Sequence, residues 1–112
     1  MNDKILSFLG ICRRAKKLVI GADSAVQSAQ NGKSKLILCA RDFSQSSLRR
    51  VREAAEQYGV PVHTLPYAKE ELSRALGKLC GVLSIEDSGF AAKLTQMLSQ
   101  DALHGDTQSL PS

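Results

Sequence analysis

The chain has 112 residues and a formal net charge of +4 at pH 7, a length typical of one domain that folds without disulfides or structural metals. No stretch approaches the ~18 apolar residues of a membrane-spanning helix, and the N-terminal pattern is unlike a signal peptide, so we expect a cytoplasmic protein without membrane contact. Its three cysteines lie far apart and outside any CxxC pair, which disfavours a metal site, and we expect no cofactor.

Helical and strand patterns alternate along the chain. Apolar residues spaced three and four positions apart predict five helices, at about residues 3–15, 22–30, 44–58, 68–76 and 88–101. Short apolar runs predict four strands, at residues 18–20, 36–40, 61–65 and 82–85. Ser88 is predicted to cap the last helix. Strict alternation with nearly all-apolar strands predicts the α/β class, with a three-layer α/β/α sandwich around a four-stranded mixed sheet.

The domain organisation is simple. Residues 1–101 are predicted to form one domain, because they contain no internal repeat and no linker. From residue 102 the sequence turns polar, and we expect residues 102–112 to form a flexible tail.

Groups that would support catalysis do not converge in the sequence. His63 lies in a strand pattern and His104 in the tail, with no nucleophile at motif spacing and no glycine-rich phosphate loop. The pair Glu86 and Asp87 precedes a predicted helix, where acids more often serve helix entry than metal binding. We therefore expect no enzyme and no metal site. A cysteine-dependent enzyme or redox sensor is the least favoured alternative, built on Cys80, which is expected in a loop and more exposed than the other cysteines.

Positive charge is concentrated in the first half of the chain. Residues 1–60 carry eleven Lys and Arg against five acids, a net charge of +6, whereas residues 61–112 carry a net charge of −2. Such asymmetry is typical of a surface that faces a polyanion, although ordinary solubilising charge explains it equally well. Aromatic residues are few, which argues against a sheet face that stacks the bases of single-stranded RNA.

Polar residues without a packing role gather in three segments that could share one end of a small sandwich. They are the end of the first helix with Arg13, Arg14, Lys16 and Lys17, the entry to the second helix with Gly21, Asp23, Ser24 and Gln27, and the loop Gly77, Lys78, Leu79, Cys80 and Gly81. Lysine and arginine neutralise phosphates, and a helix N-terminus adds oriented N–H donors. Leu79 could pack against an unstacked base. A further set, Arg49, Arg50 and Arg52, is most simply the solvated face of the third helix.

Several short segments have a distinctive order and spacing. They are residues 9–15 (LGICRRA), Gly21 with its helix, and residues 32–42 (GKSKLILCARD), 60–62, 72–78 and 87–91 (DSGFA). Spread over about residues 5–98, they resemble the kink-turn-binding ribosomal protein family of the large subunit, the "seven-Ae" type, and more closely its bacterial YlxQ-like branch.

The resemblance implies an α/β/α sandwich that binds RNA kink-turns, which are internal loops bent by sheared G·A pairs. It implies that the helix at 22–30 enters the groove at these pairs, and that the loop before the last strand covers the protruding nucleotide. The contact residues it implies are Gly21, Asp23, Ser24 and Gln27, with Lys33 and Lys35 nearby, and Gly77 to Gly81. We expect a monomer that binds kink-turn or ribosomal RNA, with the ribosome or transcription–translation factors as further candidate partners.

The sequence departs from the family at the centre of this set. Ribosomal members carry Asn-Glu two and three places after the glycine and a Lys three places further on, whereas this chain has Asp23, Ser24 and Gln27. Loss of one charge-assisted hydrogen bond costs about 1–3 kcal/mol, so we expect kink-turn affinity to be roughly ten- to a hundred-fold weaker, or the preferred RNA to differ. The alternative function is a protein-interaction module of the translation or transcription machinery with little RNA affinity.

Overall fold

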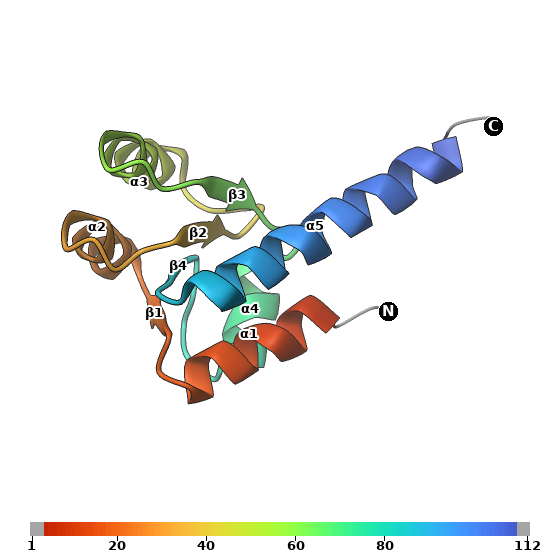
Figure 1. Ribbon diagram of the computed structural model, residues 1–112, viewed down its shortest axis with the longest axis horizontal. Helices are drawn as coiled ribbons and strands as arrows, with labels where there is room; N and C mark the ends of the chain where they lie inside the picture. Colours follow the sequence, from red (N-terminus) through yellow and green to blue (C-terminus); the bar gives the residue numbers. More distant parts are fainter. Residues whose placement is uncertain (1–3, 110–112) are drawn as a thin grey trace.

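Helices and strands alternate along the computed structural model of the chain, which describes the backbone of residues 4–109 and the side chains of residues 4–100 (Figure 1). The elements are α1 (Lys4–Arg14), β1 (Leu18–Ile20), α2 (Ala22–Gln30), β2 (Leu36–Cys39), α3 (Gln45–Gln57), β3 (Val62–Thr64), α4 (Lys69–Leu76), β4 (Val82–Ile85) and α5 (Ser88–Ser109). All nine were predicted from periodicity, most of them to within two residues at each end.

The four strands form one mixed sheet in the order β1-β4-β2-β3. β4 pairs antiparallel with both β1 and β2, with Leu83 opposite Ile20 on one side and Leu38 on the other. β2 and β3 pair in parallel, with Ile37 opposite Val62. The last strand of the chain therefore lies inside the sheet, between two strands from its first half.

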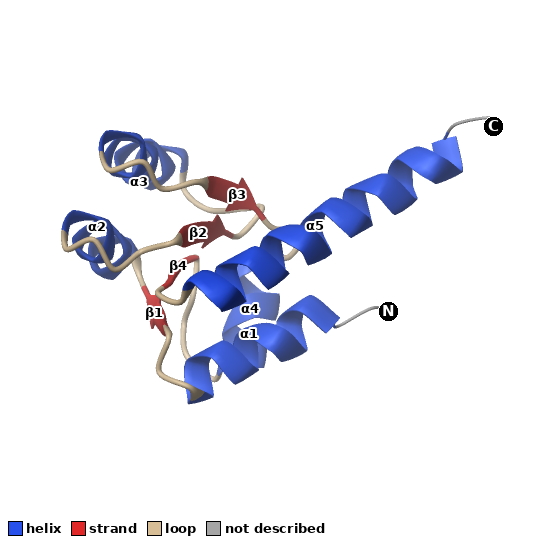
Figure 2. Ribbon diagram, in the orientation of Figure 1, coloured by secondary structure: helices blue, strands red, loops and turns tan. Residues whose placement is uncertain are grey.

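Helices cover both faces of the sheet (Figure 2). Leu36 and Leu38 of β2 pack in a cluster with residues of α1, α4 and α5. Ile37 and Cys39, which point to the opposite face, pack with α2 and α3. Successive side chains of a strand alternate between faces, so four consecutive apolar residues fill two separate cores. The predicted three-layer α/β/α sandwich is confirmed.

Three buried hydroxyl groups fasten α2 to the sheet. Ser84 Oγ of β4 donates to Ser34 Oγ at 2.7 Å and lies 3.1 Å from Ser28 Oγ of α2. Ser28 Oγ in turn donates to Glu86 Oε2 at 2.6 Å. Buried polar groups destabilise a fold unless they are paired, so this set of hydrogen bonds favours one position of α2 on the sheet.

The start and the end of α5 differ from the sequence-based expectation. Asp87 Oδ2 accepts a hydrogen bond from the Phe90 N–H at 2.8 Å, so Asp87 rather than Ser88 caps the helix. The helix continues to Ser109 and projects from the sandwich (Figure 1), past residue 102, where the sequence predicts a tail. Side chains beyond residue 100 lie outside the described part, and the flexibility of the tail stays a prediction.

Candidate functional site

Two of the three polar segments meet at one end of the sheet. The Gly21 N–H donates to the Val82 carbonyl at 2.9 Å, which places the entry of α2 beside the start of β4. The Ala40 N–H donates to the Gly81 carbonyl at 2.8 Å, so the end of β2 lies there as well. Gly21 has φ 111°, a conformation that side chains with a Cβ rarely adopt. The entry of α2 and the loop before β4 thus form one surface, which we call the Gly21 end. It consists of Gly21, Asp23, Ser24 and Gln27 together with residues 77–81.

The polar residues of the first turn of α2 do not cap the helix. Gly21 is the N-cap residue, and in the described part of the chain no side chain bonds the free N–H groups of this turn as a cap. Asp23 instead accepts a hydrogen bond at Oδ1 from Arg50 Nη2 of α3, at 2.5 Å. Ser24 is half-buried and Gln27 is exposed one turn further on. Capping therefore does not explain why these residues are polar.

The contact between Asp23 and Arg50 is the part of this surface that the sequence did not predict. α2 and α3 pack side by side on the same face of the sheet, where Ala25 and Val51 belong to one buried cluster. The two charged residues are far apart in sequence, and no motif links them. Only the packing of the two helices brings the Arg50 guanidinium to the entry of α2.

The loop from Gly77 to Gly81 is held at both of its ends. Gly77 ends α4 in the left-handed conformation, with φ 73°, and the Arg13 guanidinium donates to the carbonyl of Leu76. Near the other end, the Cys80 N–H donates to Ser73 Oγ of α4 at 2.9 Å. Between these contacts the Leu79 side chain is 81% exposed. An apolar side chain held in water on a fixed loop is available for contact with an apolar ligand surface.

Gly81 is required by close packing. A Cβ atom at this position would lie 2.9 Å from Cδ1 of the Phe43 ring, closer than real Cβ atoms approach a neighbour. Phe43 follows β2 and packs against both hydrophobic clusters, so its ring has little room to move. The absence of a side chain at Gly81 thus allows the loop to pack closely against Phe43.

Cys80 is buried, as Cys12 and Cys39 are, so the expectation that its place in a loop makes it more exposed was wrong. Its side chain is 1% exposed, and Sγ donates to the Val82 carbonyl at 3.7 Å. Burial raises the pKa of the Cys80 thiol from 9.0 to about 11, so the sulfur is a protonated thiol near neutral pH. Leu79 and Cys80 point to opposite sides of the loop, which places an apolar residue outside and the thiol inside. This geometry removes the basis for a reactive cysteine or a Cys80 side-chain contact with a ligand.

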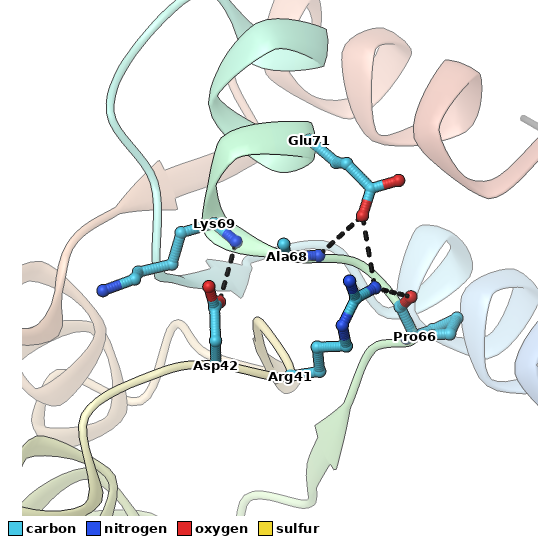
Figure 3. A network of polar contacts seen from close by, with 6 residues as sticks. All are labelled: Arg41, Asp42, Pro66, Ala68, Lys69 and Glu71. Carbon is cyan, nitrogen blue, oxygen red and sulfur yellow. Dashed lines mark hydrogen bonds and ion pairs between the residues drawn. The ribbon is translucent and has the colours of Figure 1, made fainter.

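A network of polar contacts joins the end of β2 to the start of α4 (Figure 3). Arg41 Nη1 donates to the Pro66 carbonyl at 2.9 Å and lies 3.3 Å from Glu71 Oε1. Glu71 Oε1 also accepts from the Ala68 N–H at 2.8 Å, and Asp42 Oδ1 accepts from the Lys69 N–H at 2.8 Å. These carboxylates bond the free N–H groups at the start of α4, and so position the helix that carries the 77–81 loop.

The lysines do not share the Gly21 end. The Glu86 N–H donates to the Lys17 carbonyl and the Lys35 N–H donates to the Ile85 carbonyl, both at 2.8 Å. These contacts lie where β4 ends, whereas Gly21 lies where β4 begins. Lys16 is next to Lys17 in the chain and Lys33 is two residues before Lys35. All four lysines therefore lie at the opposite end of the sheet, about 13 Å away along α2. The expectation that the first segment shares the end with α2 was wrong for Lys16 and Lys17, and Lys33 and Lys35 are not close to Gly21.

The two arginines that end α1 lie beside α4. Arg13 contacts the end of α4 as described, and Arg14 lines a groove with Gly10 and Ala75 between the two helices. Arg13 therefore has a structural contact, and Arg14 remains a solvent-exposed cation next to the start of the 77–81 loop.

Other kinds of site find little support in residues 4–100. No group of three or more His, Cys, Asp or Glu side chains there has an arrangement that could hold a metal ion. Among the described helices, none combines the length and apolar character needed to cross a membrane.

Comparisons with known proteins identify the family of the chain. Residues 3–95 match the model of the ribosomal protein L7Ae/L30e/S12e/Gadd45 family. The RNA-binding protein YlxQ of Enterococcus faecium is 30% identical over 97 residues, which cover 87% of this chain and 93% of that protein. The RNA-binding protein YlxQ of Bacillus subtilis is 34% identical over 95 residues, covering 80% of this chain and 90% of that protein. These names describe binding rather than catalysis, in agreement with the expectation that this chain is not an enzyme.

Solved structures show the same fold. A Bacillus halodurans protein described as having unknown function superposes with a TM-score of 0.81 at 29% identity, over 88% of this chain and 99% of that one. The 15.5kD RNA binding protein of Giardia lamblia superposes with a TM-score of 0.72 at 22% identity, over 89% and 92% of the two chains. On the family match over most of its length, the chain belongs to the ribosomal protein L7Ae/L30e/S12e/Gadd45 family, as a YlxQ-like member.

Proposed function

We propose that the chain is a non-catalytic protein that binds structured RNA through the Gly21 end. The observation that carries this proposal is the meeting of two segments that are far apart in sequence: the uncapped polar entry of α2 and a fixed loop with an exposed leucine. The names of the YlxQ proteins and of the Giardia lamblia protein, all of which refer to RNA binding, support it.

The preferred RNA in this proposal is an internal loop of the kink-turn type, in ribosomal or a related structured RNA. The entry of α2 offers oriented N–H donors together with Ser24 and Gln27 for base edges and phosphates. Leu79 covers an unstacked base, and Lys78 beside it supplies a cation. The protein acts as a cytoplasmic monomer, with the ribosome as a candidate site of action.

The lysines at the far end of the sheet have a different role in this proposal. Lys16, Lys17, Lys33 and Lys35 are solvent-exposed, and they lie too far from Gly21 to contact the same bases. Long-range attraction of a polyanion depends on total charge and not on contact. We assign to these lysines a long-range attraction for RNA, with an effect on affinity that is the same for every RNA of equal charge.

A titration across a salt series tests the function. A kink-turn RNA and a plain duplex of equal length are compared at each salt concentration. We expect the kink-turn to bind more tightly at every salt concentration, because salt weakens phosphate contacts equally for both RNAs. Equal affinities with a steep salt dependence would show phosphate binding alone. Absence of binding to either RNA near physiological salt would contradict the proposal and favour a protein-interaction module.

A further inference from the structure

The ion pair between Asp23 and Arg50 lies on the proposed RNA surface. Arg50 Nη2 is 2.5 Å from Asp23 Oδ1, and the two side chains are 55% and 90% exposed, respectively. Exposed ion pairs contribute little to stability, and α2 and α3 are already joined through the buried residues Ala25 and Val51. Folding therefore does not require this pair.

The negative charge of Asp23 at the entry of α2 makes the position of Arg50 important for RNA binding. A lone carboxylate at Asp23 would repel the phosphates of an RNA that approaches this end. Arg50 neutralises that charge through one N–H donor, and a guanidinium carries five. The remaining donors of an exposed guanidinium suit a phosphate or the O6 and N7 atoms of guanine. Gln27, one turn along α2, carries no charge that could do the same.

We propose that Arg50 is a cation of the RNA interface, and that Asp23 is a positioning residue that holds the Arg50 guanidinium at the entry of α2. This inference rests on the proposed function and adds to it a residue from a third element, α3. Asp23 then affects RNA affinity through Arg50, and its carboxylate makes no contact with a base.

A double-mutant cycle tests the inference, with the dissociation constant for one kink-turn RNA as the readout. The variants are Asp23→Ala, Arg50→Ala and the double variant, with Arg49→Ala as the matched control. Arg49 is next to Arg50 but about 100° around the helix, and it lines a surface hollow with Arg52 and Glu53. Its replacement removes the same charge from a different side of α3.

We expect Arg50→Ala to weaken binding about ten-fold, the effect of losing a hydrogen bond from a charged group, and Arg49→Ala to change it less than about two-fold. The slope of log K against log salt should become shallower by about 0.7–0.9 for Arg50→Ala. Asp23→Ala should weaken binding in the wild-type background and strengthen it in the Arg50→Ala background, where the unpaired carboxylate repels the phosphates. Arg50→Lys, which keeps the charge but not the planar donor set, should bind with intermediate affinity.

Several outcomes would overturn the inference. Equal losses of RNA affinity for Arg49→Ala and Arg50→Ala would show that only the net charge of the protein matters. An Asp23→Ala loss that persists without Arg50 would mean that the carboxylate contacts RNA itself. Tighter binding by Asp23→Ala in the wild-type background would mean that the pair competes with RNA. Leu79→Ala, measured in parallel, separates the two proposals: if it weakens binding while Arg50→Ala does not, the inference fails and the proposed function stands. If wild-type protein does not bind, both fail.

Discussion

The backbone N–H of Gly21 donates a hydrogen bond to the carbonyl oxygen of Val82, at 2.9 Å. This contact joins the end of β1 to the start of β4, and so brings the entry of α2 next to the loop that carries Leu79. The relative position of the two parts of the proposed RNA surface therefore depends on the pairing of β1 with β4.

Leu79→Ala should weaken RNA binding without changing stability. The side chain is 81% exposed, so its loss should change the free energy of unfolding by no more than about 0.5 kcal/mol. A leucine that packs on a base contributes apolar contact, and its removal should reduce affinity for the kink-turn RNA several-fold. Fluorescence titration and urea denaturation measure the two quantities. Ile11→Ala, at an apolar residue of α1 that is 43% exposed, is the control and should bind like wild type.

Asp87→Ala should destabilise the domain by about 1 kcal/mol, because it removes the side chain that bonds the Phe90 N–H at the start of α5. Ser88→Ala is the matched control and should lie within about 0.5 kcal/mol of wild type. Urea denaturation of both variants measures the two changes in the free energy of unfolding. The reverse order of effects would restore Ser88 as the cap.

Gly81→Ala should destabilise the domain by about 1–3 kcal/mol, since the new methyl group would overlap the Phe43 ring. The same substitution in a Phe43→Ala background should cost much less, because the ring is then absent. The two differences in unfolding free energy are obtained from urea denaturation. Equal costs in both backgrounds would show that the overlap with Phe43 is not the cause.

The cysteines predict a loss of stability at high pH. Burial raises the pKa values of Cys12, Cys39 and Cys80 from 9.0 to about 11 in the folded protein. The folded chain keeps these protons to a higher pH than the unfolded chain, so this contribution to stability is complete below pH 9 and is lost as the pH rises from 9 toward 11. Denaturation under reducing conditions across this range should show a smaller loss for Cys80→Ala. Superimposable pH curves for the two proteins would contradict the prediction.

The elements of the fold could be predicted from the sequence because each has a clear local pattern. The four apolar residues Leu36 to Cys39 and the i, i+3, i+4 spacings of the helices identify strands and helices without knowledge of their partners. The cap of α5 was assigned one residue too late, since Asp87 and Ser88 are both good capping residues and only the geometry of the turn distinguishes them.

The arrangement of the site was less predictable, for reasons of direction and distance. Lys17 and Gly21 are four residues apart in the chain, yet they lie at opposite ends of the sheet because β1 crosses it between them. The distance between two residues in the sequence does not show at which end of the sheet each of them lies. That depends on the direction in which the strand between them runs. The contact of Asp23 with Arg50 depends on how two helices pack, which no local pattern encodes.

The position of β4 also determines when the proposed surface can exist. β4 is the last strand of the chain but lies between β1 and β2, so an N-terminal segment that ends before residue 82 lacks the strand that joins them. The entry of α2 then has no Val82 to hold Gly21, and the 77–81 loop has no strand to lead into. During synthesis the domain can acquire this surface only after almost all of its sandwich has been made, which ties RNA recognition to completed folding.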